Sequence, residues 1–375
     1  MKILNICSVP VTYLGGTERV ILKLSKELSK KNDVTILQTN LYEESKKFKK
    51  ESNIGKIKVI TCKNDRYLGG YGYSSEFKKI LKQIWKNYDV IHIHGYGRFT
   101  SNFSLNFLYK KKPIFFSAHG FFHDKKHQMF KKIHDLLFSK LLKKANLCIA
   151  LTNIEKEQYL RKKVKEEKVA IIPAGVNLEK FVNIRDKQFK NKYLKENSQE
   201  VIMLYVGRIH ESKGLAYVLK AIKNIPLKFL IVGKDTGYKK VLERLIKKEK
   251  IESKVKFLGG VSDNDLFKIY SISDFLVLFS SWEGFGISVI EAMAAKKPVI
   301  VSNRGALPTI IKNNENGFVV EYPNINELSK KIVSLVKNKK LREQMGAKAG
   351  NLAKEFNWSN IAKKHLNMYL KEYKK

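Results

Sequence analysis

The sequence has few cysteines and no long apolar segment. Its three cysteines form no Cys-x-x-Cys spacing, and Cys7 and Cys148 lie in apolar stretches typical of buried strands, so we expect neither a disulfide framework nor a thiolate metal site. The longest apolar runs, such as FLVLF at 275–279, are far shorter than the ~20 residues that cross a bilayer. The first ten residues, MKILNICSVP, lack the long apolar centre of a signal peptide. We therefore expect a cytoplasmic protein.

Acidic residues and arginine are also scarce. The 375 residues include 73 Lys and Arg against 35 Asp and Glu, a formal net charge of +38, and only nine of the basic residues are Arg. Residues 1–177 have a net charge of +20 and residues 178–375 one of +18, so neither half is the basic one. A uniform lysine excess indicates composition bias more than a nucleic-acid surface. Arginines in glycine-containing loops are more informative, because a guanidinium binds phosphate through a planar fork; these are Arg19, Arg98, Arg208 and Arg304.

Length and periodicity predict an α/β protein with two Rossmann-like, doubly wound domains facing a central cleft. A chain of this length exceeds one ordinary core, and 43% hydrophobic with 29% charged residues excludes disorder. Short apolar runs alternate with helical patterns in both halves, which is typical of parallel sheets. The predicted strands are residues 2–7, 34–37, 58–60, 90–93, 114–117, 147–150 and 169–172 in the first half, and 202–206, 229–232, 255–258, 275–279, 299–301 and 318–320 in the second.

We place the domains at residues 1–177 and 201–357. The connector, 178–200, is polar and lacks periodicity. A first helix is expected at about 17–31 with Thr17 as its cap, and a final amphipathic helix at 358–373. Sheets of this kind bind ligands at the carboxyl ends of their strands, so the function is expected there.

Two glutamates with seven residues between them follow a predicted strand, in the segment EGFGISVIE at 283–291. Gly284 and Gly286 allow the backbone to approach a ligand, and a helix beginning near Ile287 directs free N–H groups toward an anion. Glu291, about one turn into that helix, can accept hydrogen bonds from ribose hydroxyls. Taken alone, Glu283 and Glu291 are better explained by favourable charge near a helix N-terminus, and only their sequence context favours a functional role.

A second segment, YVGRIHESKG at 205–214, places two cations just before the next predicted helix. Arg208 and Lys213 can together bind a diphosphate. The alternative is a pair of solvated charges, and for Lys213 alone, one of very many lysines, that alternative is favoured. Because arginine is rare here and Arg208 follows Gly207, a functional role is favoured for Arg208.

These motifs together resemble glycosyltransferase family 4, the retaining transferases with the GT-B fold. The matching segments run along almost the whole chain and are specific as a set, although each alone is weak. They are GGTE at 15–18, HIHG at 92–95, SAHG at 117–120, IPAGVN at 172–177, VGR at 206–208, KG at 213–214, VG at 232–233, FLG at 257–259, the two-glutamate segment, and KPVI at 297–300.

The resemblance implies that the second domain binds a nucleotide-sugar donor, expected to be a UDP-sugar. Arg208 and Lys213 would hold the diphosphate and Glu291 the ribose, while Glu283 would hold the donor sugar. The remaining expected donor contacts are Gly207 and the backbone of Phe285, Gly286 and Ile287. No metal and no other cofactor is expected, since the cations and the helix start would stabilise the leaving diphosphate.

The resemblance also implies that the first domain shapes the site of a saccharide or lipid-linked acceptor in cell-surface glycan biosynthesis. Gly15 and Gly16 would close over the phosphates, and His119 would contact the donor sugar near its reacting carbon. The last helix would return to the first domain. Retention is usually explained by front-side attack, and no protein nucleophile is identified. The expected acceptor-side residues are His94, Phe121 and Phe122.

The sequence departs from the family pattern at two positions. Thr309 follows Pro308 where an acid is common, and Lys296 stands where a glycine is common before Lys297. The first departure leaves no role for an acid at that position. Neither changes the diphosphate-binding residues.

Three other patterns have competing interpretations. Asp263-Asn-Asp265 matches the DxD of metal-dependent transferases, but capping of a helix that begins at Ser262 and Asp263 is favoured. His92 and His94 share one face of a strand, where packing or a hydrogen bond to substrate is favoured over metal ligation. His123, His127 and His134 are expected at the surface.

The segment 121–132 mixes aromatic residues with lysine, and 42–58 is similarly basic. Both fit a surface that contacts anionic lipid at the inner face of the membrane, and both fit lysine-coated helices over a core stripe. Other functions left open are a sugar-nucleotide epimerase of the same architecture and a basic nucleic-acid binder. A dinucleotide dehydrogenase is disfavoured, because no G-x-G-x-x-G follows the first strand.

Overall fold

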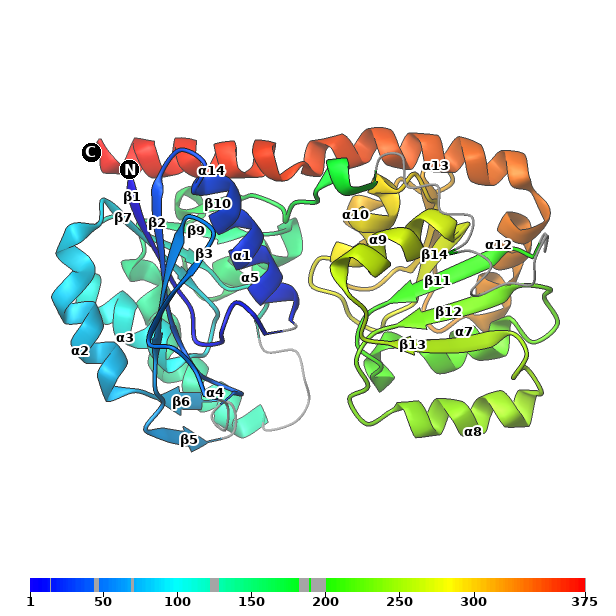
Figure 1. Cartoon of the computed structure of the whole chain (residues 1–375), viewed down its shortest axis with the longest axis horizontal. Helices are drawn as coiled ribbons and strands as arrows, with labels where there is room; N and C mark the ends of the chain where they lie inside the picture. The colour runs from blue at the N-terminus through cyan, green and yellow to red at the C-terminus, as the bar shows by residue number, and fades with distance from the viewer. Residues whose placement is uncertain are drawn as a thin grey trace. The chain divides into compact units, whose positions relative to one another are not determined.

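The computed structural model describes residues 1–13, 15–43, 47–68, 71–121, 128–181, 189 and 200–374, which divide into two compact units. Unit 1 comprises Met1–Gly175 and Trp358–Lys375, and unit 2 comprises Val176–Asn357. Each unit is a sheet with helices packed on it (Figure 1). Of the predicted connector, 178–200, only its first turn, η4 (Leu178–Phe181), Phe189 and Glu200 are described. Among the described residues, no helix has the length and apolar character that crossing a membrane requires.

The sheet of unit 1 has eight strands in the order β10-β9-β8-β7-β1-β2-β4-β3. All neighbours are parallel except β3 and β4, which form an antiparallel edge. The central strands are buried on both sides, as expected for a sheet covered on both faces. The strands are β1 (Lys2–Ile6), β2 (Asp33–Thr39), β3 (Glu51–Ile54), β4 (Ile57–Cys62), β7 (Val90–His94), β8 (Ile114–Ser117), β9 (Leu147–Ala150) and β10 (Val169–Ile171), and a separate hairpin consists of β5 (Arg66–Leu68) and β6 (Tyr71–Tyr73).

The helices of unit 1 cover this sheet. The predicted cap of the first helix, Thr17, is wrong: α1 begins at Gly16 with Gly15 as its N-cap, so Thr17 already lies in the first turn. The carboxylate of Glu18 folds back over Gly15, where a Cβ would lie 1.9 Å from Oε2. The helices are α1 (Gly16–Leu28), α2 (Ser75–Ile84), α3 (Phe99–Leu108), α4 (Gln128–Phe138), α5 (Asn153–Arg161) and α14 (Trp358–Tyr373), with 3₁₀ turns η1 (Trp85–Asn87), η2 (Ser139–Lys144) and η3 (Glu166–Lys168).

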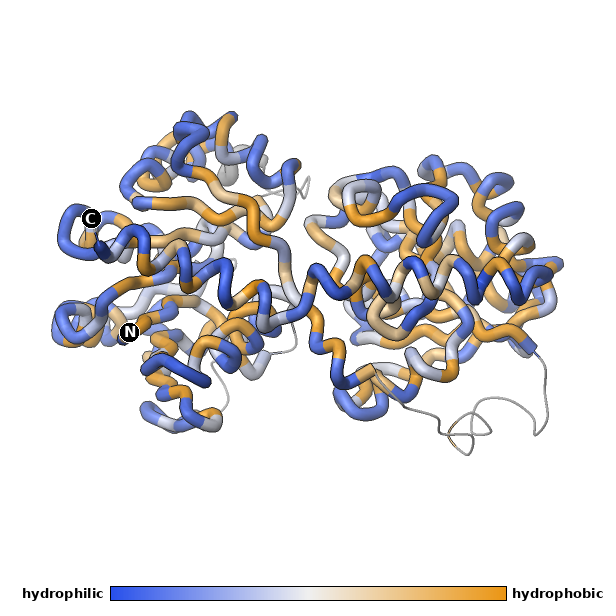
Figure 2. The backbone as a smooth tube through the Cα atoms, turned by 90° about the horizontal axis from the view of Figure 1, so that it is seen from above, coloured by the Kyte–Doolittle hydropathy of each residue, from blue (hydrophilic) through white to orange (hydrophobic). Residues whose placement is uncertain are grey.

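The final helix, α14, belongs to unit 1, although the chain reaches it through unit 2. It packs against α1, and Tyr369 is fully buried. Trp358 contacts Gly175 so closely that a Cβ at Gly175 would lie 2.5 Å from the indole. Hydrophilic and hydrophobic residues alternate along the helix (Figure 2), as expected when one face is packed and the other is solvated.

Unit 2 has a six-stranded, fully parallel sheet in the order β13-β12-β11-β14-β15-β16. Its strands are β11 (Ile202–Val206), β12 (Lys228–Val232), β13 (Val255–Gly259), β14 (Phe275–Leu278), β15 (Val299–Ser302) and β16 (Gly317–Val320). Its helices are α7 (Leu215–Ala221), α8 (Lys239–Glu249), α9 (Asp263–Ile272), α10 (Ile287–Ala294), α11 (Leu307–Ile310), α12 (Ile325–Lys337) and α13 (Lys339–Ala353), with turns η5 (Glu211–Lys213) and η6 (Lys354–Phe356).

The strand orders define where ligands can approach each sheet. In unit 1, β1 pairs with β2 on one side and β7 on the other; in unit 2, β11 pairs with β12 and β14 in the same way. At such a switch in strand order, the connections leave in opposite directions and open a crevice at the carboxyl ends. The ends of β11 and β14, and those of β1 and β7 with the adjacent β8, therefore position the candidate residues.

Candidate functional site

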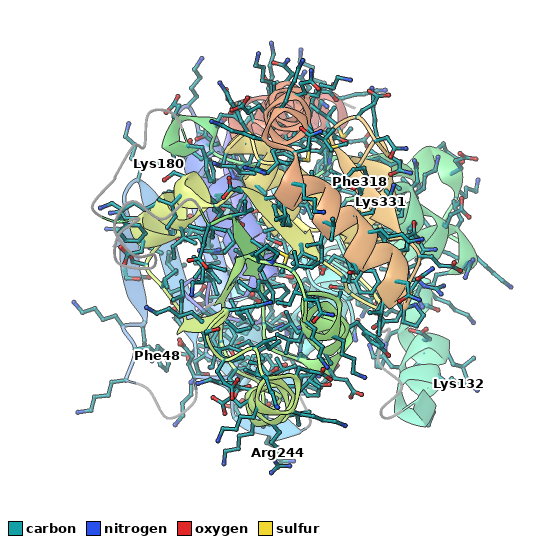
Figure 3. The ribbon with its side chains drawn as sticks, turned by 90° about the vertical axis from the view of Figure 1, so that its right-hand side faces the viewer. Phe48, Lys132, Lys180, Arg244, Phe318 and Lys331 are labelled. Carbon is teal, nitrogen blue, oxygen red and sulfur yellow. The ribbon has the colours of Figure 1, made fainter. Side chains whose placement is uncertain are left out.

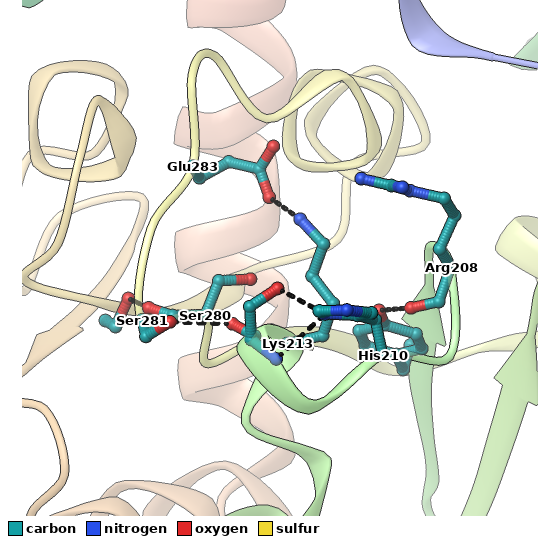
Figure 4. A network of polar contacts seen from close by, with 9 residues as sticks. Arg208, His210, Lys213, Ser280, Ser281 and Glu283 are labelled. Carbon is teal, nitrogen blue, oxygen red and sulfur yellow. Dashed lines mark hydrogen bonds and ion pairs between the residues drawn. The ribbon is translucent and has the colours of Figure 1, made fainter. Parts of the chain in front are cut away.

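The carboxyl ends of β11 and β14 bring Arg208, Lys213 and Glu283 together in unit 2. Lys213 Nζ donates to Glu283 Oε2 at 2.7 Å, and the two side chains are only 12% and 20% exposed. The guanidinium of Arg208, an exposed residue, extends toward this ion pair (Figure 4). Two cations beside one carboxylate leave a surplus of positive charge, which suits the binding of a phosphate group.

The backbone of the loop after β11 is held in place by a buried tyrosine and by close contacts at two glycines. The buried Tyr205 donates its hydroxyl hydrogen bond to the carbonyl oxygen of Arg208 at 2.8 Å. A Cβ at Gly207 would lie 2.7 Å from that hydroxyl, and one at Gly233 would lie 1.8 Å from the carbonyl oxygen of Gly207. Both glycines therefore allow the close approach that holds Arg208 in place.

The loops after β11 and β14 are also joined to each other. Ser281 donates its backbone N–H to the carbonyl oxygen of Ser212 at 2.8 Å. Gly214 has a φ of +66°, and a Cβ there would lie 1.9 Å from the carbonyl oxygen of Phe279. These contacts set the distance between the loops that carry Lys213 and Glu283.

The start of α10 lies three residues beyond Glu283. Gly286 is its N-cap with a φ of +94°, and no side chain of the described residues caps it by a hydrogen bond. The Glu283 backbone is held by Gly305 and Ala306, whose N–H donates to the Glu283 carbonyl oxygen at 2.9 Å. The first N–H groups of α10, at Ile287 and the next residues, are thus oriented as an anion site requires.

The second glutamate, Glu291, is half-buried on α10 and oriented by Tyr270. The Tyr270 hydroxyl donates to Glu291 Oε2 at 2.8 Å, and it lies 3.3 Å from the carbonyl oxygen of Ser288. One carboxylate oxygen of Glu291 is therefore held by the protein. This arrangement fixes the direction of the other oxygen, which can accept hydrogen bonds from a ligand.

In unit 1, β7 and β8 bring together the histidines that the sequence singled out. His119 follows β8 and adopts the left-handed conformation, with a φ of 54°. Its Nε2 lies 2.9 Å from His94 Nδ1. Burial lowers the pKa of His119 to about 4 and that of His94 well below its ordinary value. Both imidazoles are therefore neutral at pH 7. Gly15 and Gly16 lie at the start of α1, which follows β1.

The expected acceptor-side residues have different environments. His94 is buried, and its Nε2 lies 3.1 Å from Asn5 Oδ1, so both of its ring nitrogens are engaged within unit 1. Phe121 is half-buried against Tyr96 and Tyr159. Phe122 lies outside the described residues.

The prediction that His134 lies at the surface is wrong. Its ring is buried between Tyr96 and Phe138, and its Nε2 lies 3.2 Å from Asn102 Nδ2. Phe138 lies one turn later on the same face of α4, and together with Tyr96 it covers the His134 ring. The other two histidines predicted at the surface, His123 and His127, lie outside the described residues.

The DxD-like pattern caps a helix, as predicted. Ser262 Oγ accepts the backbone N–H of Asp265 at 3.1 Å, and Asp263 begins α9. In the part of the chain that the structure describes, no three His, Cys, Asp or Glu side chains group in a way that could hold a metal ion. The three cysteines are free and buried.

Two buried polar residues that support the unit 1 histidines were not predicted from the sequence. Glu155 accepts the N–H of Gly120 at 2.9 Å and that of Leu151 at 2.6 Å, and burial raises its pKa. Asn5, which contacts His94, lies in the middle of β1. The one signal for Asn5 was an amide within an otherwise apolar strand, whereas nothing distinguished Glu155 from neighbouring charged residues.

Both units match known families. Residues 14–180 match the family described as Glycosyltransferase Family 4, and residues 186–352 match Glycosyl transferases group 1. The chain is 30% identical to the UDP-Gal:alpha-D-GlcNAc-diphosphoundecaprenol alpha-1,3-galactosyltransferase of Escherichia coli, over 70% of each chain. Sucrose-phosphate synthase from Thermosynechococcus elongatus has the same fold, with a TM-score of 0.84 at 21% identity over 99% of each chain. Alr3699/HepE of Anabaena, solved in complex with UDP-glucose, has a TM-score of 0.79 at 18% identity over 99% of this chain and 100% of its own.

Proposed function

Because the chain belongs to glycosyltransferase family 4 and has the GT-B fold, we propose that it transfers a sugar from a UDP-sugar to a saccharide or lipid-linked acceptor in cell-surface glycan biosynthesis. The observation that carries the proposal is the Lys213–Glu283 ion pair beside Arg208 at the ends of β11 and β14. The relatives support the donor and the acceptor: the name of the E. coli enzyme specifies UDP-Gal and a diphosphoundecaprenol-linked sugar, and HepE binds UDP-glucose.

In this proposal, unit 2 binds the donor. Arg208 and Lys213 bind the diphosphate, together with the N–H groups at the start of α10. Glu291, held on one side by Tyr270, accepts hydrogen bonds from the ribose hydroxyls. Glu283 orients Lys213 and contacts the sugar. The other expected donor contacts are Gly207, Phe285, Gly286 and Ile287 in unit 2, and Gly15, Gly16 and His119 in unit 1.

The proposed reaction retains the anomeric configuration. The bond between the sugar C1 and the diphosphate oxygen breaks, and the acceptor oxygen bonds to C1 from the same face. The acceptor proton passes to an oxygen of the departing diphosphate, so no protein nucleophile is required. Negative charge develops on the diphosphate as its bond breaks, and Arg208, Lys213 and the α10 N–H groups stabilise that charge without a required metal ion.

The proposal is tested by assaying transfer with a panel of UDP-sugars and saccharide or lipid-linked acceptors. Arg208→Ala should lower kcat/KM by about a hundredfold or more, since it removes charge stabilisation of the leaving group. Arg244→Ala, at an exposed arginine on α8 (Figure 3), is the matched control and should retain activity. Equal activity of the two variants would contradict the proposed diphosphate site.

Two further measurements separate the alternatives. Incubation with donor alone distinguishes an epimerase, which would convert the nucleotide-sugar without an acceptor, from a transferase. Activity in EDTA tests metal independence. Complete loss in EDTA that Mg²⁺ or Mn²⁺ restores would refute the proposed metal-free mechanism.

We also propose that unit 1 contacts an anionic membrane through α4. Three apolar side chains at the spacing i, i+3, i+4 are exposed there: Ile133 by 48%, Leu136 by 72% and Leu137 by 61%. His134 and Phe138 contact each other on another side of the helix, so α4 has a second apolar stripe, which is exposed. The described part of the predicted lipid-contacting segment 121–132 leads into this stripe, and its residues 122–127 lie outside the described part.

Charge indicates the partner of this stripe. Lys132 and Lys140 are exposed beside it, and Lys132 extends outward from α4 (Figure 3). The acid of this helix, Asp135, is already paired with Lys162 at 2.5 Å. An apolar stripe flanked by exposed lysines fits an anionic bilayer surface. Apolar side chains enter the interface of such a surface, and ammonium groups contact its headgroups.

Vesicle flotation tests this contact. The Leu136→Gln/Leu137→Gln variant should float less with phosphatidylglycerol vesicles than the wild type. Val241→Gln, at a 45% exposed position on α8, should not change flotation. Wild-type protein that fails to float with these vesicles at low salt would refute the contact, and self-association through the stripe would appear as a dimer in sedimentation without lipid.

A further inference from the structure

A chain of buried hydrogen bonds runs from α1 through the sheet of unit 1 to His119. Asn5 Nδ2 donates to Ser25 Oγ at 3.0 Å, and Asn5 Oδ1 lies 3.1 Å from His94 Nε2. His94 Nδ1 lies 2.9 Å from His119 Nε2. The four residues come from α1, β1, β7 and the loop after β8, so the chain depends on the fold of the whole unit rather than on one loop.

The direction of donation along this chain follows from its first member. Asn5 uses its amide N–H toward Ser25, so its carbonyl oxygen can only accept from His94, and His94 Nε2 must carry a hydrogen. A neutral His94 then has a lone pair at Nδ1 and accepts from His119 Nε2–H. The remaining nitrogen of His119, Nδ1, therefore has no hydrogen and can only accept.

The environment of both rings keeps them neutral. Burial lowers the pKa of His94 and of His119, and the neighbouring His119 lowers that of His94 further. Burial and the neighbouring His94, whose ring centroid lies 3.9 Å away, lower the pKa of His92 as well. At pH 7 one tautomer of each ring is therefore selected by the hydrogen-bond chain.

The Nδ1 atom of His119 is buried, and no hydrogen-bond partner reaches it from the described residues. An acceptor without a partner in the protein interior is rare, because its interaction with water has been lost without replacement. The backbone conformation at His119 sets the direction of this atom. The φ of His119 is 54°, and the N–H of the following Gly120 donates to the buried carboxylate of Glu155. A ligand that donates a hydrogen bond would satisfy this atom.

We propose that Asn5 and His94 are positioning residues that hold the Nδ1 lone pair of His119 ready to accept a hydrogen bond from a hydroxyl of the donor sugar. This inference rests on the proposed function, in which His119 contacts that sugar. His94 would then orient His119, whereas the sequence led us to expect that His94 contacts the acceptor. A site of this kind selects for a sugar that has the contacted hydroxyl and rejects an analogue in which hydrogen or fluorine replaces it, because neither can donate.

The neighbouring His92 shows why the two histidines of β7 differ. Its Nδ1 lies 2.7 Å from the Tyr369 hydroxyl and its Nε2 lies 2.9 Å from Ser117 Oγ, so both nitrogens are satisfied within unit 1. His92 thus connects β7 and β8 to α14. Ser117→Ala removes one partner of His92 without removing a member of the chain that ends at His119, and it serves as the structural control.

The first test is the tautomer itself, read from the ring ¹⁵N resonances of the ¹⁵N-labelled full-length protein. We expect His94 and His119 both to be Nε2–H tautomers at pH 7 without ligand. In His94→Gln, the amide can accept from His119 and donate to Asn5, so His119 should keep its tautomer. In His94→Leu, the His119 resonances should show a mixture of tautomers or the Nδ1–H form. An Nδ1–H tautomer of His119 in the wild type would overturn the proposal.

The second test is kinetic, with the UDP-sugar that the wild type uses. His94→Leu should lower kcat/KM by about tenfold or more, the worth of a hydrogen bond in the transition state, while His94→Gln and Ser117→Ala stay within a few fold of the wild type. The loss in His94→Leu should vanish for the deoxy donor that lacks the contacted hydroxyl. If the wild type transfers the sugar and His94→Leu has the same kcat/KM, the inference about His94 is refuted and the proposed function is not. Absence of transfer with every nucleotide-sugar would refute the proposed function, while the tautomer measurement would still decide the geometry.

Discussion

Lys213 Nζ lies 2.7 Å from Glu283 Oε2 and thereby joins the loop after β11 to the loop after β14. The pair is mostly buried, so the attraction between the two charges compensates for the hydration that each has lost. Lys213→Met should lower the free energy of unfolding by about 1–3 kcal/mol, because it leaves the Glu283 carboxylate without its partner.

Urea denaturation of Lys213→Met, Glu283→Gln and the double variant measures this coupling. The double variant should lose less free energy of unfolding than the sum of the two single losses, since the second substitution removes a charge that is already unpaired. Strictly additive losses would show that the pair contributes no interaction energy. All three variants should lose transfer activity, because each removes a proposed donor contact.

Gly214 is a position where only glycine fits. Its φ is +66°, and a Cβ would lie 1.9 Å from the carbonyl oxygen of Phe279. Gly214→Ala should therefore cost about 2 kcal/mol or more in the free energy of unfolding, from backbone strain and the displaced β14 loop together. Gly260→Ala, where the structure shows open space around the added Cβ, is the control and should change it by less than about 1 kcal/mol in thermal or urea unfolding. Equal effects at the two positions would contradict the close contact.

The elements that were predicted correctly have signals that are local in sequence. The thirteen predicted strands are all present, with ends that differ by two residues or fewer, because a buried parallel strand is a short apolar run. The cations of the 205–214 segment were identified because a glycine and an arginine follow such a strand. Arg208, Lys213 and Glu283 lie together because β11 and β14 are adjacent in the sheet, and this strand order was not predicted from the sequence.

Elements without such a signal were missed. The edge strand β3 has the sequence ESNI and shows no alternation, since its one partner is β4. The helix α13 was not predicted because its buried positions include small residues, Gly346, Ala349 and Ala353, which pack closely without a stripe of large apolar side chains. The burial of His134 depends on Tyr96, which is far away in sequence, and no local pattern contains that information.

The buried histidines of unit 1 make its stability depend on pH. The pKa of His119 is lowered to about 4 and that of His365, on α14, to about 3, while His92 and His94 are lowered well below the ordinary 6.5; burial is the main cause for each. The unfolded chain binds these protons as pH falls below about 6.5, whereas the folded chain does not. The stability is therefore fully present above that pH and is lost as pH falls toward 4 and then 3.

Each such histidine should contribute a slope of about 1.4 kcal/mol per pH unit in the range between the two pKa values. Urea unfolding at pH 7.5, 6.5, 5.5 and 4.5, followed by a signal from unit 1, measures the slope. His365→Leu should reduce the slope by the contribution of one histidine. This holds whatever the absolute free energy of unfolding of the variant is. A free energy of unfolding that does not change with pH over this range would contradict the lowered pKa values of these histidines.

Tyr270 offers a test of the ribose site that leaves every charge in place. Its hydroxyl holds Glu291 Oε2 at 2.8 Å, and the ring itself is fully buried against other side chains. Tyr270→Phe keeps the packing and removes the hydroxyl that orients the Glu291 carboxylate and that also lies 3.3 Å from the Ser288 carbonyl oxygen. UDP should therefore bind about three- to tenfold more weakly, as expected for the loss of the hydrogen bond to Glu291. Titration calorimetry with UDP measures this change, and Tyr373→Phe, at an exposed tyrosine near the end of α14, is the control that should bind UDP as the wild type does. If Tyr270→Phe binds UDP unchanged while Glu291→Ala loses affinity, the carboxylate acts without orientation by Tyr270. If neither variant changes UDP affinity, the ribose does not contact Glu291.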